Sequence, residues 1–275
     1  MIKKILILAF LITIVGVAGG KEAVKRPRKP KPLRDGFAMS GVDGRVVTAG
    51  NKATWYFMPF SDVTDDKGVA KADKPIAFLP SAGLEKLIAS TKKHASGNYK
   101  LWGRVTQYEG RNYIFVWYFV EISEAKPARP KDTEPNQSQK APSINDPNDT
   151  LMIPKEVLAK LRTRKIVRTE QLEEGLNLKQ DSILADRIGF IRGPWPVTRD
   201  PNQEYSFVLD GLGRKAGQVS FPLLPCNILE RAVDKQSRLL DPPRFKVAGI
   251  VTKYKDKHYL LLQRAKRIYT HGNFN

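Results

Sequence analysis

The amino-acid sequence predicts a mainly β protein with short helices, built as two tandem five-stranded barrels joined by a disordered linker. Residues 99–115 (YKLWGRVTQYEGRNYIF) match 245–261 (FKVAGIVTKYKDKHYLL) without a gap. In the same order, FLPSAGLEK at 78–86 matches LLPCNILER at 223–231. Residues 125–149, between the copies, have almost no large apolar side chain and cannot offset the entropy of ordering. Together these observations predict a tandem duplication.

Each copy is expected to have the strand order of one small barrel. In the first copy, strands are predicted at 39–47, 54–60 and 76–79, followed by a helix and two longer strands joined by a tight turn. Gly103, in the middle of the fourth strand, is typical of a kink. Three strands, a helix and two strands is the order of the oligonucleotide/oligosaccharide-binding (OB) fold. We therefore predict two OB-fold-like barrels.

The amino terminus combines a targeting signal with a basic flank. MIKK is followed by ILILAFLITIVGVAGG, whose length and small final residues are typical of a signal peptide. The basic, Pro-rich residues 21–35 favour the alternative of an uncleaved membrane anchor. The predicted organisation is a signal peptide or anchor at 1–20, a basic Pro-rich tail at 21–35, a first barrel at 36–124, a disordered linker at 125–150, and a lead-in helix with a second barrel at 151–275.

The net charge of the chain limits the classes of partner that it favours. It has 47 basic and 28 acidic residues and a formal charge of +19, which attracts nucleic acid, acidic glycans or lipid headgroups. Solubility alone is the competing interpretation, because basic residues are dispersed as well as clustered. The single cysteine, Cys226, excludes an internal disulfide framework.

Three segments carry a family resemblance. LLPCNILE, FKVAGIVTKYKDKHYLLLQRA and the terminal YTHGNF resemble an uncharacterised exported protein family of planctomycete-type bacteria. The resemblance is close only for residues 151–275. It implies a periplasmic or cell-envelope setting and supplies no activity.

The two copies agree at some positions of the hairpin and differ at others. Tyr108 and Tyr254 flank the turns and are expected to stabilise the hairpins, with stacking on a ligand as the alternative. The closing strand of the first copy, NYIFVWYFVEI, is apolar on both faces. Its cover is expected to be the partner barrel or the lead-in helix, or else it forms an exposed aromatic platform.

The loop between the fourth and fifth strands borders the ligand groove in such barrels. In the second copy it is rich in lysine, which favours contacts with phosphates or acidic sugars, although charged residues are also ordinary in a solvated hairpin. The candidate ligand-binding residues are Trp102, Arg104, Tyr108, Arg111, Trp117, Lys253, Lys255, Lys257 and His258.

No catalytic signature stands out. His94, His258 and His271 lack metal-type spacing, and neither a nucleophile elbow nor a phosphate-binding glycine loop is present. We expect no enzyme activity, no cofactor and no metal. The predicted function is an exported, non-enzymatic envelope or periplasmic protein that binds or scaffolds through a protein partner or an anionic polymer. The alternative is a nucleic-acid-binding protein anchored at the cytoplasmic face of the membrane.

Overall fold

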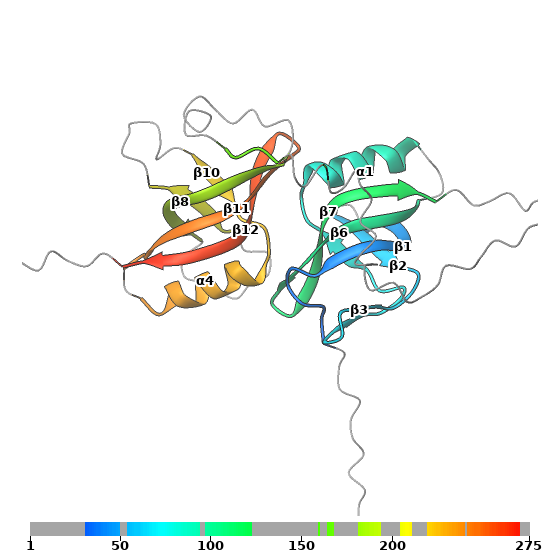
Figure 1. Ribbon diagram of the computed structural model, residues 1–275, viewed down its shortest axis with the longest axis horizontal. Helices are drawn as coiled ribbons and strands as arrows, with labels where there is room; N and C mark the ends of the chain where they lie inside the picture. The colour runs from blue at the N-terminus through cyan, green and yellow to red at the C-terminus, as the bar shows by residue number, and fades with distance from the viewer. Residues whose placement is uncertain are drawn as a thin grey trace, which may run out of the picture.

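The computed structural model describes residues 31–49, 54–93, 97–122, 159, 164–167, 181–193, 204–210, 219–239 and 241–269. It confirms the predicted fold class, because these residues form mainly β structure with two short helices and a closed five-stranded barrel. Figure 1 shows two halves side by side. The predicted signal segment, the linker and all but a few residues around the lead-in helix lie outside the described residues.

The first half is the closed barrel, with strand order β1-β2-β5-β7-β6. Its elements are β1 (Ala38–Ala49), β2 (Thr54–Pro59), β3 (Val63–Thr64), β4 (Val69–Ala70), β5 (Ile76–Phe78), α1 (Ala82–Lys93), β6 (Asn98–Tyr108) and β7 (Arg111–Glu121). β5 pairs with β7 in parallel, and the other neighbours in the barrel pair antiparallel. This is the predicted OB order with one addition. The β3–β4 hairpin, inserted before β5, was not predicted because each of its strands has only two residues.

Among its described residues, the second half repeats the order without an inserted hairpin. Its elements are β8 (Ser182–Arg192), β9 (Ser206–Leu209), β10 (Ser220–Pro222), α4 (Asn227–Ser237), β11 (Arg244–Tyr254) and β12 (Lys257–Ile268). They form a five-stranded sheet in the order β10-β9-β8-β11-β12. An isolated parallel bridge between Leu223 and Leu260 joins its two edges. Within the described residues the second half is therefore a sheet joined at one point rather than a fully closed barrel.

A glycine fixes the same kink in both halves. The pairing of β6 with β7 shifts register immediately before Gly103, and that of β11 with β12 shifts immediately before Gly249. A Cβ atom at Gly103 would lie 2.7 Å from the backbone oxygen of Phe115, and one at Gly249 would lie 2.4 Å from that of Leu261. No larger residue fits at either position, which explains why the glycine occurs in both copies. Common descent of the halves remains a prediction from the sequence.

The repeated hairpins reach across from each half into the other. Tyr108, at the end of β6, is 6% exposed and belongs to the apolar cluster of the second half. Tyr254, at the end of β11, is 8% exposed and belongs to the cluster of the first half. The two tyrosines thus make a reciprocal contact between the halves. We call it the hairpin exchange.

Two threonines repeated in the sequence add hydrogen bonds to the hairpin exchange. Thr106 Oγ1 donates to the backbone oxygen of Pro225, just before α4, over 2.9 Å. Thr252 Oγ1 accepts a hydrogen bond from the backbone N–H of Ala82, the first residue of α1, also over 2.9 Å. The Thr252 hydroxyl therefore serves an N–H group at the start of α1, where such groups lack partners within the helix, whereas the Thr106 hydroxyl binds a carbonyl oxygen just before α4.

Residues 31–37 cross the first half as a strap. Leu33 is fully buried, and its backbone N–H and carbonyl pair with the side chain of Asn112 over 2.9 and 2.8 Å. Asp35 Oδ1 accepts hydrogen bonds from the backbone N–H groups of Gln107 and Asn227, the latter being the first residue of α4. The predicted unfolded tail therefore ends earlier than residue 35, because its last residues pack on the barrel.

Candidate functional site

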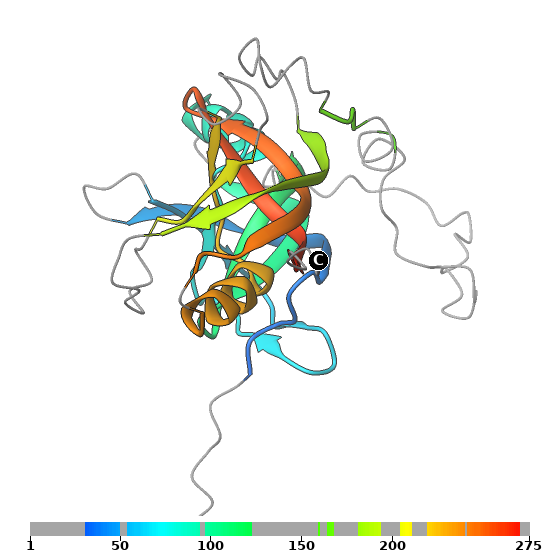
Figure 2. The ribbon, with the colours of Figure 1, turned by 90° about the vertical axis from the view of Figure 1, so that its left-hand side faces the viewer.

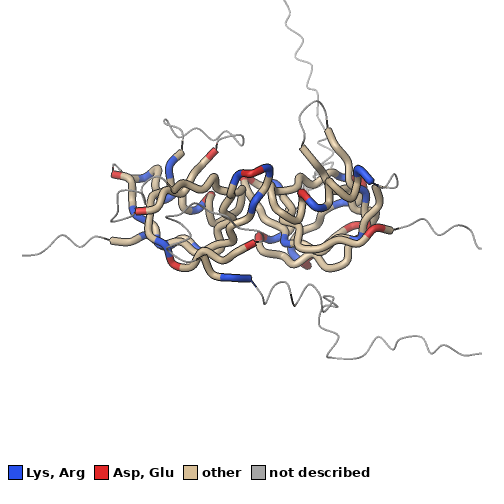
Figure 3. The backbone as a smooth tube through the Cα atoms, turned by 90° about the horizontal axis from the view of Figure 1, so that it is seen from above, with Lys and Arg blue, Asp and Glu red and all other residues tan. Residues whose placement is uncertain are grey.

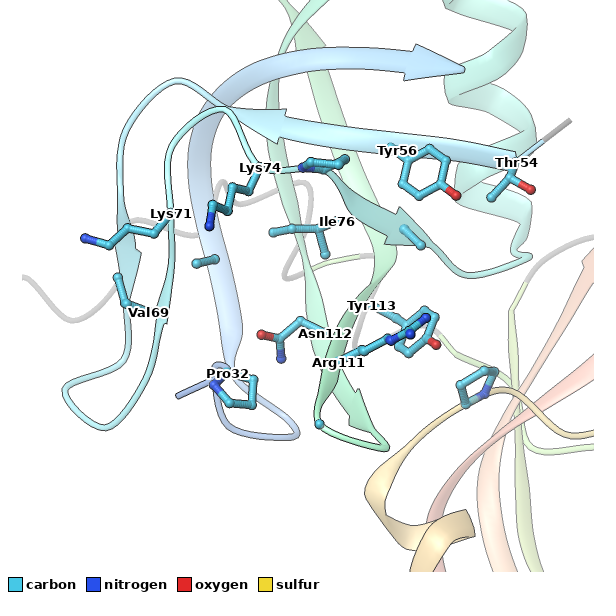
Figure 4. Close-up of a pocket in the computed structure, with 15 residues that line it drawn as sticks. Pro32, Thr54, Tyr56, Val69, Lys71, Lys74, Ile76, Arg111, Asn112 and Tyr113 are labelled. Atoms are coloured by element: carbon cyan, nitrogen blue, oxygen red, sulfur yellow. The ribbon is translucent and has the colours of Figure 1, made fainter. Parts of the chain in front are cut away.

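A groove of about 590 Å³ lies on the barrel of the first half, as Figure 4 shows. Residues of β2, β5, the β3–β4 hairpin and the start of β7 line it, together with Pro32 of the strap. β2 and β5 are the second and third strands in OB order. That face and the loop between the fourth and fifth strands are where OB folds bind oligonucleotides and oligosaccharides. The groove therefore lies where this fold places a ligand.

Asp65 holds the hairpin wall of the groove in place. Its buried carboxylate accepts hydrogen bonds from the backbone N–H groups of Arg34, Lys67 and Gly68 at 2.6, 3.1 and 2.6 Å. Burial alone would raise the pKa of Asp65, but these hydrogen bonds and the Arg34 guanidinium outweigh it and lower the pKa to about 2. The charged carboxylate thereby ties the β3–β4 hairpin to the strap.

The polar lining of the groove is basic. Its charged residues are Lys71, Lys74 and Arg111, and none of the described residues that line it is acidic. Lys71 Nζ lies 2.5 Å from Asp62 Oδ2, just outside the lining. Lys74 and Arg111 have no ion pair within the described part of the chain. Basic and acidic residues are dispersed over both described halves (Figure 3), whereas the charged residues that line the groove are all basic.

Two tyrosines, from the strands on either side of β5, also line the groove. Tyr56 lies on β2 and Tyr113 on β7, next to Arg111, as Figure 4 shows. Burial raises the pKa of Tyr113, while the charge of Arg111 acts in the opposite direction. The phenol therefore stays protonated at neutral pH and can donate a hydrogen bond, while the half-buried ring offers a partly open face. Aromatic rings beside cations suit the flat groups and the charges of an anionic chain.

The second half contributes to the same groove. Pro225, which precedes α4, is among the lining residues, and so is Gly110 in the turn between β6 and β7. Tyr108, at the base of this turn, is buried against the second half. The backbone N–H of Glu109 in the same turn donates to Glu230 Oε2 of α4 over 3.1 Å. The hairpin exchange thus fixes one wall of the groove.

The structure disperses the ligand-binding residues predicted in the first copy. Arg111 lies in the groove, but Tyr108 is buried between the halves and leaves little of its ring for a ligand. Trp102 is 8% exposed, with its ring 5.5 Å from that of Tyr118. The Arg104 guanidinium lies against the backbone of the strap. Half-buried Trp117 packs on the apolar cluster of the second half, so the partner half contributes to the predicted cover of its strand.

The hairpin residues predicted in the second copy lie around the turn between β11 and β12. Lys253 Nζ is 3.0 Å from Asp256 Oδ1, and Lys255 Nζ lies 5.4 Å from the centre of the Tyr254 ring. Lys257 is exposed. His258 is half-buried; its burial, together with the charge of Lys253, lowers its pKa. No described residue hydrogen-bonds to its Nε2 atom. Arg111 is therefore the one residue of the predicted set that lines the groove.

Sequence reasoning missed Tyr56, Lys71 and Lys74. The two lysines lie at and just after the β3–β4 hairpin, which has no recognisable strand pattern. Tyr56 lies on a strand that was predicted, but nothing in the sequence marked it as facing a groove. A gapped alignment of the two copies would have shown that Tyr56 has no tyrosine counterpart.

Comparisons with known proteins identify no relative. No protein-family model and no curated protein matches the chain. Among solved structures, a Replication Protein A heterotrimer bound to ssDNA matches at 12% identity and a TM-score of 0.19, over 87% of this chain and 50% of the other. The chain thus spans about half the length of that structure's chain. The match is too weak to indicate a function.

None of the described helices is long and apolar enough to span a membrane, and the described residues hold no group of three or more His, Cys, Asp or Glu suited to a metal ion.

Proposed function

We propose that this chain is a non-enzymatic binding protein that holds an extended anionic polymer in the groove of its first half. The observation that carries the proposal is the lining of the groove, with Tyr56, Tyr113 and three cations and no acidic residue among the described ones. A surface of that composition disfavours cations and neutralises anions. Its position on β2 and β5 agrees with the general ligand face of OB folds.

The shape of the groove supports a chain-like ligand over a small molecule. It is an open groove at the junction of the barrel, the inserted hairpin and the turn, with cations on two different sides. Arg111 and Tyr113 lie on the turn side, and Lys74 comes from the segment that follows the hairpin. A polymer crossing from one side to the other would present successive anionic groups to these cations and a flat group to a tyrosine.

The proposed setting is the cell envelope or periplasm, where the polymer would be an acidic glycan. The apolar N-terminal segment and the exported family that residues 151–275 resemble support this setting. The basic segment that follows would add attraction to acidic lipid or glycan. The alternative from the sequence is a nucleic-acid-binding protein held at the cytoplasmic face. A mature amino terminus close to Lys21 supports export, whereas an intact Met1 supports the alternative.

The groove is tested by comparing matched cations in the two halves. Arg111, in the groove, and Lys257, in the second half, are the first residues after equivalent turns. We expect Arg111→Gln to weaken binding of labelled polygalacturonate or oligothymidylate several-fold at low salt and to reduce the salt slope by about one. Lys257→Gln should leave both unchanged. Fluorescence anisotropy at several salt concentrations measures both quantities.

The outcomes separate the ligand classes as well. Binding of polygalacturonate alone supports the envelope proposal, and binding of oligothymidylate alone supports the alternative. Equal effects of Arg111→Gln and Lys257→Gln would show that attraction depends on net charge rather than on the groove. Tyr56→Ala tests stacking separately, because it removes a ring without changing the charge.

A further inference from the structure

The second half has a distinct basic surface on the outer face of β8, β11 and β12. We propose that this face binds the surface of an anionic lipid bilayer, independently of the groove. Figure 2 turns the second half toward the viewer, with these three strands visible. The central observation is a pair of exposed lysines, Lys246 on β11 and Lys266 on β12, which lie directly opposite each other.

Two like charges in directly opposite positions of an antiparallel pair repel each other. Neither Lys246 nor Lys266 has an acidic partner within the described part of the chain. The neighbouring arginines of the same face do have partners. Arg244 pairs with Asp210 over 3.1 Å, and Arg264 pairs with Asp186. Among the described residues, the face therefore holds two adjacent charges without an acidic partner, which an external anion would neutralise.

The equivalent face of the first half lacks this feature. Lys100 corresponds to Lys246 in the matched segments. Its opposite neighbour on β7 is Val120, and on the other side it faces Asp43 of β1, with Lys100 Nζ 3.6 Å from Asp43 Oδ1. A lysine in this strand position can thus be neutralised locally in this fold. The lysine pair without acidic partners is therefore a feature of the second half and is not required by the fold that both halves share.

An exposed apolar residue on the face favours a bilayer over a soluble polymer. Lys246 faces Lys266 on one side and Ile188 of β8 on the other, and Ile188 is 41% exposed. An exposed apolar residue beside two lysines suits the headgroup region, where lysines contact phosphates and apolar groups enter the interface. The groove uses partly buried rings instead, as expected for stacking on a polymer.

The test is co-sedimentation of the full chain with vesicles of phosphatidylcholine, with and without phosphatidylglycerol. The difference between the two vesicles cancels any common contribution of the apolar N-terminal segment. We expect the wild type to partition more strongly onto anionic vesicles. Since each basic residue near such a surface contributes about 1 kcal/mol, Lys246→Gln/Lys266→Gln should lower that partition by roughly tenfold or more. Lys100→Gln is the matched control and should not change it.

A second variant separates binding from folding. Lys266→Glu places an acidic residue opposite Lys246, so the melting temperature should stay the same or rise while partition onto anionic vesicles falls. The proposal is overturned if the double variant partitions like the wild type, or if Lys100→Gln causes an equal loss. It is also overturned if the double variant loses binding to polygalacturonate or oligothymidylate but keeps vesicle binding, which would assign the face to a polymer.

Discussion

The two halves of this chain share the residues that join them and differ on the face that would bind a ligand. Tyr56 of β2 lies opposite Val47 of β1, and in the second half the equivalent pair is Ser206 of β9 with Arg192 of β8. By the same register, Thr54 corresponds to Glu204. The second half therefore lacks the ring of Tyr56 and has an acidic residue where the groove has Thr54. Its sheet has the same order, but among the described residues this face carries an acidic residue, whereas the groove has none.

The tyrosines that follow the turns show the same difference in their surroundings. Tyr113 and Tyr259 are equivalent, and burial is the largest cause that raises the pKa of each. The next contributions differ, since Arg111 acts on Tyr113 and Glu204 acts on Tyr259. One tyrosine thus lies near a cation and the other near a carboxylate. At this equivalent position, the largest charge contribution to the tyrosine pKa comes from a cation in the first half and from a carboxylate in the second.

The largest expected effect tests whether the contact between the halves is reciprocal. Tyr108→Ala and Tyr254→Ala each remove a buried ring from the apolar cluster of the other half. Each should lower the free energy of unfolding by about 4 kcal/mol, the usual cost of removing a large buried aromatic side chain. Chemical denaturation measures both, with Tyr→Phe at each position as the control that keeps the ring. A large loss from one variant alone would show that the hairpin exchange is one-sided.

The second-largest expected effect concerns Asp65, which holds the β3–β4 hairpin in place as one wall of the groove. Asp65→Asn removes the charge that accepts hydrogen bonds from the strap and the hairpin, and should cost about 3 kcal/mol at neutral pH. The folded-state pKa of Asp65 is lowered to about 2. The difference in free energy of unfolding between the wild type and Asp65→Asn should therefore be complete above the unfolded pKa of about 4. It should disappear as pH falls toward 2. Denaturation of both proteins across this range measures it, and a constant difference would contradict it.

The smallest effects compare the two threonines of the hairpin exchange. Thr106→Val removes one hydrogen bond and should cost about 1 kcal/mol. Thr252→Val should cost about 2 kcal/mol, because the hydroxyl accepts from the backbone of Ala82 and donates to Asp181 Oδ1 over 2.6 Å. Serine at either position is the control, since it keeps the hydroxyl.

The pH dependence distinguishes the two threonine variants. Burial raises the pKa of Asp181, and the hydrogen bond from Thr252 opposes that rise. Ionisation of Asp181 therefore reduces stability as pH rises above the unfolded pKa, and the loss should be greater without the hydroxyl. The deficit of Thr252→Val should grow from acid to neutral pH, whereas that of Thr106→Val should not. Equal pH profiles would contradict this account.

The strand order could be predicted from the sequence because it depends on local patterns. The matched hairpins, the mid-strand glycines and the apolar helix faces all report on neighbours within one half. The predicted strands at 39–47, 54–60 and 76–79 differ from β1, β2 and β5 by at most two residues at any end. Gly103 was expected at a kink, and the register shift lies immediately before it.

The groove could not be predicted, since it depends on contacts between distant segments. The strap joins the barrel through Asn112 and Asp65, which lie far from it in sequence. The repeated tyrosines were assigned to hairpin stability within each copy, and nothing in a sequence indicates that two copies contact each other through the same residues. Tyr56 escaped attention because unequal loops before β2 and β9 shift the alignment of these strands relative to the rest of the copies.

The hairpin exchange also affects how such a molecule can change. In an assembly of two identical subunits, every substitution near a shared contact appears in both partners at once. Here each partner is encoded separately, so one gene can preserve the mutual fit of Tyr108 and Tyr254 while it alters a single neighbouring position on one side only. The ligand-binding surface of the first half and the differently charged surface of the second can therefore change independently, while the contact between the halves stays intact.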